Sequence, residues 1–226
     1  YSQAQGSLSA GERIFSLLDT VPTIVDKKDA GEFVDIKGEI EFENVTFRYE
    51  EGKPVFSELD LTIHAGTSVA LVGETGGGKS TIINLICRFY EPTEGAVKID
   101  GTDYRQMTTK SLRSRIGVVL QTPHLFSGTI KDNIKYGRTD ATDEEVIESL
   151  RLIGADEFIE RLDEEAGEGG ERLSLGEKQL LSFARAVLSD PKIFIMDEAT
   201  SSVDTLTEAR IQTGIQEIMK NRTSVI

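Results

Sequence analysis

The chain has 226 residues, 38% apolar and 28% charged, so it can bury a core and is not a disordered protein. Its 25 Lys and Arg against 39 Asp and Glu give a net charge of −14, which repels a phosphate backbone and argues against extended nucleic-acid binding. The single cysteine, Cys87, permits no internal disulfide, and with two histidines a Cys/His metal site is implausible. We interpret Cys87 as a reduced thiol on a buried helix face.

The first element expected is a short amphipathic helix over residues 8–19, where apolar side chains lie among Ser, Glu and Arg. Pro22 ends it, and residues 25–36 form a charged connector without a clear period, either a frayed terminus or a tether to a preceding domain. The chain opens at Tyr1 and not Met, and it stops on an apolar run, so both ends are expected to be cut from something longer. No apolar run approaches the roughly 20 residues that cross a bilayer, so no membrane span is expected.

Globular patterning starts near Glu39. Ile40 and Phe42 alternate with polar residues, then the phase slips before Val45, which predicts two strand pieces separated by a turn or bulge. Further strands are expected at 68–72, 97–100, 116–120, 193–197 and 223–226, and helices at 80–90, 143–153, 178–188 and 206–220. Thr142 and Glu145 form a capping-box pattern for the second helix. Apolar strands without alternation, interleaved with helices, favour an α/β fold with a parallel sheet covered on both faces.

The strongest local signal is a glycine-rich loop between a strand and a helix. Gly73-Glu-Thr-Gly-Gly-Gly-Lys-Ser80 matches G-x-x-x-x-G-K-[ST] at every fixed position. Glycines let successive backbone N–H groups surround an anion, and the helix N-terminus adds its positive dipole end. Lys79 would reach the β- and γ-phosphates, and the Ser80 hydroxyl would bind Mg²⁺. The candidate nucleotide-binding residues here are Gly73, Glu74, Thr75, Gly76, Gly77, Gly78, Lys79, Ser80 and Thr81.

A second signal follows the apolar run at 193–196, where two acids end a buried strand. Asp197 would hold Mg²⁺, directly or through water, and Glu198 would orient or deprotonate the attacking water. Alone, such a pair is more often a helix cap or a solvated edge. Together with the phosphate loop, it indicates hydrolysis of a nucleoside triphosphate.

A third motif identifies the family. Leu173-Ser-Leu-Gly-Glu-Lys-Gln179 resembles the LSGGQ signature of ATP-binding-cassette (ABC) ATPases, and it precedes Asp197-Glu198 by a short helix. The resemblance implies ATP and Mg²⁺ as ligands, Tyr49 stacking on adenine, and Gln121 touching Mg²⁺ and acting in catalysis with Lys79 and Glu198. It also implies that Ser174, Gly176 and Glu177 contact the nucleotide held by a partner domain, and that Ser201-Ser-Val-Asp204 is the D-loop. Ala166–Arg172 is similar to the X-loop of exporters.

Two more segments resemble exporters within that family. Leu125–Ile134 is similar to the region that grips the coupling helix of the membrane domain, and Gly11–Asp19 is similar to the stretch after the last membrane helix. These segments argue against the DNA-repair and translation-factor branches, as does the charge of −14.

The signature departs from the family pattern at Leu175, where glycine is usual, and at Glu177, where glutamine is usual. Leucine removes backbone freedom and an acid adds negative charge beside the expected γ-phosphate, which points to a weakened site. A simpler interpretation is a capping box in which Ser174 and Glu177 satisfy backbone N–H groups of the helix, worth about 1 kcal/mol. Gly77, where serine is common, carries little weight.

The resemblance also implies a switch histidine after the strand expected at 223–226. Neither His64 nor His124 occupies that position, so we expect the chain to end before it and to bind ATP but hydrolyse it poorly.

We therefore predict a P-loop NTPase of α/β class with a RecA-like parallel core, an antiparallel β subdomain and an α-helical signature subdomain. Residues 1–36 would be a post-membrane helix and linker, and 37–226 the ABC ATPase domain, with its helical subdomain at about 127–183. The expected partners are a second ABC ATPase domain, identical or different, and transmembrane domains, at the cytoplasmic face of the cell membrane. Two alternatives stay open: a hydrolysis-poor half of a heterodimeric transporter, and a non-transport P-loop ATPase.

Overall fold

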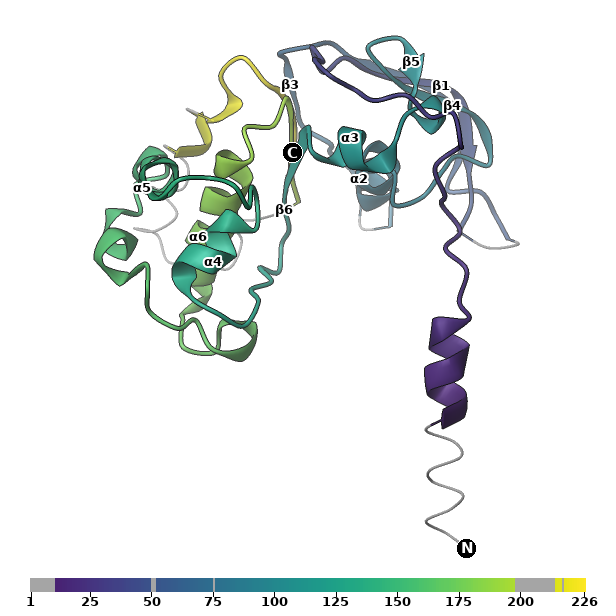
Figure 1. Ribbon diagram of the computed structural model, residues 1–226. Helices are drawn as coiled ribbons and strands as arrows, with labels where there is room; N and C mark the ends of the chain where they lie inside the picture. The colour runs from purple at the N-terminus through teal and green to yellow at the C-terminus, as the bar shows by residue number, and fades with distance from the viewer. Residues whose placement is uncertain (1–10, 50–51, 75, 198–213, 217) are drawn as a thin grey trace, which may run out of the picture.

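The computed structural model describes residues 11–49, 52–74, 76–197, 214–216 and 218–226. A four-stranded sheet and its helices lie on one side of a second sheet, and a group of helices lies on the other (Figure 1). The first sheet is antiparallel, in the order β2–β1–β4–β5. Its strands are β1 (Ile40–Phe47), β2 (Phe56–Ile63), β4 (Glu94–Ile99) and β5 (Thr102–Asp103).

The phase slip in β1 is a β-bulge, as the sequence predicts. The register of β1 against β2 shifts between Phe42 and Val45, and Asn44 takes a left-handed φ of 50° inside that interval. One continuous strand thus replaces the two expected pieces, because the bulge returns Val45 and Phe47 to the buried face.

The second sheet is parallel, in the order β3–β8–β7–β6. Its strands are β3 (Ser68–Val69), β6 (Ile116–Val119), β7 (Ile193–Met196) and β8 (Thr223–Val225). The predicted extension of β3 to Val72 is wrong: the ladder ends where the Leu71 N–H donates to the Ile226 carbonyl at 2.7 Å, and Val72 beyond it is 93% exposed. The two sheets confirm the predicted fold class.

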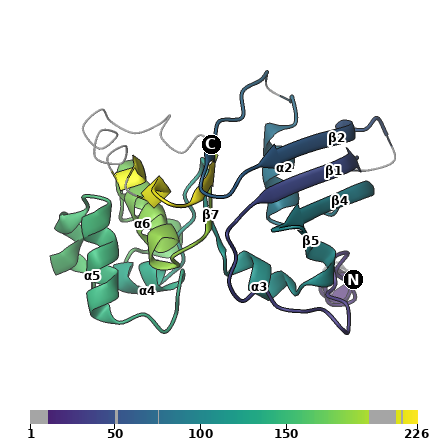
Figure 2. The same ribbon diagram turned by 90° about the horizontal axis from the view of Figure 1, so that it is seen from above.

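The helices divide between the two sides of the parallel sheet (Figure 2). The helices α2 (Lys79–Ile86) and α3 (Thr109–Arg113) lie beside the antiparallel sheet, and α4 (Ile130–Lys135), α5 (Asp143–Leu152) and α6 (Leu175–Leu188) form the other group. Short 3-10 helices are η1 (Tyr104–Gln106), η2 (Asp156–Arg161) and η3 (Glu168–Gly170). Of the helix expected at 206–220, residues 214–216 and 218–219 are described and are helical.

Capping boxes fix the starts of α4, α5 and α6. Thr142 and Glu145 cap α5 as predicted, and Ser174 and Glu177 cap α6 in the same way. Because Ser174 is the N-cap, α6 begins three residues before the expected Lys178 and includes most of the signature motif.

Strand β7 separates two hydrophobic cores. Phe194 packs into the core of the α4–α6 group, whereas Ile193 and Ile195 pack into the core under the antiparallel sheet. All four β7 residues are buried, as expected of a parallel strand covered on both faces. Cys87 lies in the second core, and burial raises the pKa of its thiol to about 12, which keeps it protonated.

The connector packs onto the domain from Asp26 onward. Asp26 accepts a hydrogen bond from the Thr109 amide at 2.9 Å, and the Phe33 amide donates to the Ser111 hydroxyl at 3.1 Å. Phe33 and Ile36 are buried in the second core, so the ordered chain extends into residues for which the sequence shows no period.

The helix at residues 11–18 instead stands away from the body, with Ile14, Phe15, Leu17 and Leu18 exposed (Figure 1). Within the described ranges, no helix is both long and apolar enough to cross a membrane.

Candidate functional site

The glycine-rich loop joins β3 to α2, as its sequence predicts. Gly76 and Gly78 have φ values of 84° and 89°, a region that side chains rarely adopt. Gly78 is the N-cap of α2, and a Cβ there would lie 2.4 Å from the ring of Phe56. Glycine at 78 is therefore required both by the backbone angle and by the close approach of β2.

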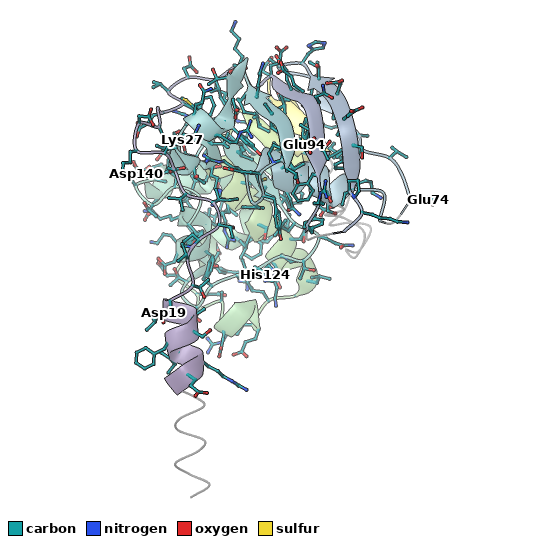
Figure 3. The ribbon with its side chains drawn as sticks, turned by 90° about the vertical axis from the view of Figure 1, so that its right-hand side faces the viewer. Asp19, Lys27, Glu74, Glu94, His124 and Asp140 are labelled. Atoms are coloured by element: carbon teal, nitrogen blue, oxygen red, sulfur yellow. The ribbon has the colours of Figure 1, made fainter. Side chains whose placement is uncertain are left out.

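Lys79 folds back over this loop. Its Nζ donates to the carbonyl oxygens of Gly73 at 2.8 Å and Glu74 at 3.1 Å. The side chain of Glu74 lies at the outer edge of the molecule and away from the body (Figure 3). Among the described residues, the ammonium group thus donates to two neutral carbonyl oxygens of its own loop, and a phosphate bound in the loop can take their place.

The structure brings eight predicted site residues together in one pocket of about 510 Å³. Gln121 follows β6 and Asp197 follows β7, so both lie at the carboxyl ends of adjacent parallel strands, where the Asp197 amide donates to the Val119 carbonyl at 3.0 Å. The lining comprises Tyr49, Val55, Gly76, Gly78, Lys79, Ser80, Thr81, Gln121 and Asp197. Gly73, Glu74 and Gly77 belong to the same loop, and Thr75 and Glu198 lie outside the described residues.

The oxygen atoms of this pocket suit a hard cation. Ser80 offers a hydroxyl, Gln121 an amide oxygen and Asp197 a carboxylate, which are the donor types that Mg²⁺ prefers alongside phosphate oxygens and water. The described residues contain no group of three or more His, Cys, Asp or Glu side chains that could hold a metal by themselves. This combination fits a metal brought in with a phosphate ligand.

Tyr49 lies in an aromatic cluster at the mouth of the pocket. Its ring meets those of Phe47 and Tyr90 edge-on, with centroids 4.9 and 5.0 Å apart, and it remains 47% exposed. Its hydroxyl lies 2.8 Å from the hydroxyl of Thr81, within hydrogen-bonding distance, and Thr81 is buried. Sequence reasoning missed Tyr90 and Val55, because the contacts that bring them here are made in the fold.

The signature residues do not line this pocket; they lie at the start of α6. Ser174 and Leu175 are exposed at the start of α6. Glu177 turns back toward Ser174, whose amide donates to its Oε2 at 2.8 Å, which confirms the capping-box interpretation. The other oxygen, Oε1, accepts from Arg161 at 2.8 Å, a contact that the sequence does not reveal.

Replacing Gly78 with alanine tests the packing of the loop. We expect Gly78→Ala to lower the free energy of unfolding by about 2–3 kcal/mol and to weaken ATP binding about tenfold, since it adds left-handed strain and a clash with Phe56. Gly101→Ala is the matched control, because Gly101 has a φ of 76° and open space around it. Equal losses in the two variants, by urea denaturation, would contradict the clash; recovery in Gly78→Ala/Phe56→Ala would support it.

Three comparisons place this chain among known proteins. A model of the ABC transporter family matches residues 56–201. The chain is 47% identical over 230 residues to the uncharacterized ABC transporter ATP-binding protein YknV of Bacillus subtilis strain 168, across 100% of the chain and 38% of that protein. It is 44% identical over 226 residues to an ATP-dependent lipid A-core flippase of Syntrophus aciditrophicus strain SB, across 98% of the chain and 37% of the flippase.

A solved structure of a bacterial Atm1-family ABC exporter with ATP bound matches with a TM-score of 0.87 and 38% identity, over 98% of this chain and 39% of that one. These matches confirm the predicted resemblance. The chain spans 37% to 39% of the length of these three relatives.

Proposed function

This chain belongs to the ABC transporter family and forms its ATP-binding domain, and on that premise we propose that it hydrolyses ATP to drive export through transmembrane domains. The observation that carries the proposal is the pocket in which Lys79, Gln121 and Asp197 meet, although they come from three separate segments. Such a site, at the carboxyl ends of parallel strands and at a helix N-terminus, is built for phosphate.

Each residue has a role that follows from its chemistry. The amides of Gly76 and Gly78 surround the phosphates, and the ammonium group of Lys79 neutralises their charge. Ser80, Gln121 and Asp197 would hold Mg²⁺, which when bound offsets negative charge on the transferred phosphoryl group. We assign Tyr49 to the adenine ring, because it is the exposed aromatic side chain at the pocket mouth. Glu198 would position the attacking water.

The surface beside α4 fits a membrane-domain partner. Phe126 and Tyr136 are exposed and their ring centroids lie 4.3 Å apart. Arg185 stacks against both rings, at 5.5 and 5.6 Å, and donates to Asn133 and His124 carbonyl oxygens. An exposed aromatic pair held rigid from beneath is typical of an interaction site, so we assign it to a transmembrane domain.

The apolar side chains of the helix at 11–18 support the same arrangement. Ile14, Phe15, Leu17 and Leu18 find no cover in the described part of the chain, so this segment would lie against the transmembrane domains. The domain would then work at the cytoplasmic face of the cell membrane.

A second ATP-binding domain would complete the proposed ATP site. The signature residues of this chain do not line its own pocket, so Ser174 and Gly176 would contact the ATP of a second copy. The alternative, a different partner chain and a weakened shared site, rests on Leu175, which is 45% exposed where glycine is usual in the family.

Light scattering of a Glu198→Gln chain, with and without ATP and Mg²⁺, tests the pairing. We expect a monomer without nucleotide and a dimer with it, because blocked hydrolysis preserves an ATP-bridged pair. The same protein with Lys79→Ala serves as control and should stay monomeric. A monomer that binds ATP would point to the different partner chain, and a chain that binds no ATP would refute the proposed function.

A further inference from the structure

The acidic residue in the signature keeps its full charge. Burial raises the pKa of Glu177, but the hydrogen bonds from Arg161 and from Ser174 outweigh that effect and leave the pKa below its ordinary value. Glu177 is therefore a carboxylate at neutral pH, one helical turn from the exposed Ser174 and Leu175. An unbalanced carboxylate at this place would oppose any phosphate that the signature meets.

The structure supplies the balancing charge from another element. Arg161 ends η2 and donates through one terminal nitrogen to Glu177 Oε1 at 2.8 Å. Its Nε donates to Glu164 at 2.9 Å, and its guanidinium stacks 5.2 Å from the buried ring of Phe158. The Arg161 and Glu177 side chains are 32% and 29% exposed, so the pair is partly desolvated and screened less than a surface pair.

Both carboxylate oxygen atoms of Glu177 thus accept a hydrogen bond within the chain. Oε2 accepts from the Ser174 amide and Oε1 from Arg161, which turns the carboxylate back toward its own subdomain. The N–H groups in the first turn of a helix point outward from its N-terminus, where an anion can bind. In α6, the Glu177 N–H donates to the Ser174 hydroxyl at 3.2 Å as part of the capping box.

We propose that Arg161 is a positioning residue for the signature, which neutralises Glu177 so that α6 can still meet the phosphate of a bound nucleotide. The inference rests on the proposed function, in which this signature contacts ATP held by a second copy. It removes one of the two reasons to regard the signature as degenerate, because the added negative charge has a counter-ion inside the same chain.

The same motif at α5 provides a matched control. There Thr142 and Glu145 form the capping box, and Arg138 forms an ion pair with Glu145. The α5 pair reproduces the local chemistry of the α6 pair without a signature motif. If Arg161 only stabilises a helix start, the two arginines should behave alike.

The experiment measures ATP-driven dimerisation in the Glu198→Gln chain with Mg²⁺, by sedimentation equilibrium. We expect Arg161→Ala to raise the dimer dissociation constant about tenfold, because it leaves Glu177 unbalanced beside the phosphate. Arg161→Ala/Glu177→Gln should return to within about twofold of Glu177→Gln alone, since no charge is left to balance. Arg138→Ala should leave dimerisation unchanged, and ATP affinity of the monomer should be unchanged throughout.

Rescue separates charge balance from folding. If Arg161 has only a structural role, the double variant stays as weak as Arg161→Ala, and that result overturns the inference, as does an unchanged Arg161→Ala. Arg161→Gln, which keeps a planar group over Phe158 without the charge, repeats the test should Arg161→Ala unfold. If the Glu198→Gln parent chain binds ATP but does not dimerise, both the proposed pairing with a second copy and this inference are refuted. That result differs from a dimerisation defect that is confined to the Arg161 variants.

Discussion

Replacing Arg88 with methionine is expected to lower the free energy of unfolding by about 3–5 kcal/mol, the largest loss of stability that the structure predicts. Arg88 is 1% exposed, and its guanidinium donates to Glu91 at 2.8 Å, to Asp26 at 3.2 Å and to the carbonyl oxygens of Tyr104 and Met107. Methionine matches much of the volume but removes the Arg88 donor from all four acceptors; Asp26 and the Tyr104 carbonyl still accept from Thr109 and from the Met107 N–H. Urea denaturation measures the loss.

Asp26→Asn is the graded control for that experiment. Asp26 is about one-third exposed, and an asparagine in its place can still accept the hydrogen bonds from Thr109. We therefore expect Asp26→Asn to lower the free energy of unfolding far less than Arg88→Met does. The Thr109 hydroxyl, followed by its amide and by Arg88 and Arg113, holds the pKa of Asp26 below its ordinary value of 3.8 despite the opposing effect of burial.

The pH dependence of stability follows from that shift. The stabilisation by Asp26 is fully present above its ordinary pKa and is lost as pH falls through the lower folded value. Asp26→Asn should therefore make the free energy of unfolding less dependent on pH in this acidic range.

A loss below about 1 kcal/mol in the free energy of unfolding for Arg88→Met would show that the buried network contributes little.

Arg88 also shows where sequence reasoning ends. The residue has no motif around it, and it takes a left-handed φ of 52°. Apart from Glu91, its partners are distant in sequence: Asp26 lies 62 residues away in the connector, and Tyr104 and Met107 lie beyond β4. Buried ion networks between distant segments leave no periodic pattern. The sequence leaves the connector as either a frayed terminus or a tether, whereas in the structure Asp26, Phe33 and Ile36 join it to the domain.

The phosphate site was predictable because its chemistry is local. The glycines, lysine and serine between Gly73 and Ser80 are enough to predict a phosphate-binding loop. The apolar run before Asp197 predicts a strand that is covered on both faces. The family resemblance predicted Gln121 and Asp197 beside the same Mg²⁺, and the structure brings them into one pocket, because the carboxyl ends of the parallel strands β6 and β7 share one edge. The ends of elements were predicted less well: α6 starts early at its cap, and β3 stops at Val69 where the pattern continues to Val72.

Replacing Lys79 with alanine is expected to weaken ATP binding about 100-fold, which is the largest effect on ligand affinity that the site predicts. The ammonium group now contacts the carbonyl oxygens of Gly73 and Glu74, and it lies at the pocket that Ser80 and Asp197 also line. Its loss removes a charge-assisted contact to the phosphates, and calorimetric titration with ATP and Mg²⁺ measures the change.

Lys53→Ala removes the same unit of charge from an exposed position two residues before Val55, and therefore separates a direct contact from the general field of the protein. With a net charge of −14, any lost cation makes the chain less attractive to ATP, but that field is screened beyond about 10 Å at 0.1 M salt. We expect Lys53→Ala to change affinity less than about threefold at this salt concentration. Equal losses in the two variants would mean that Lys79 acts through net charge alone. A specific contact requires that the Lys79→Ala chain also keep its free energy of unfolding, because the Lys79 hydrogen bonds in the described part of the chain go to its own loop.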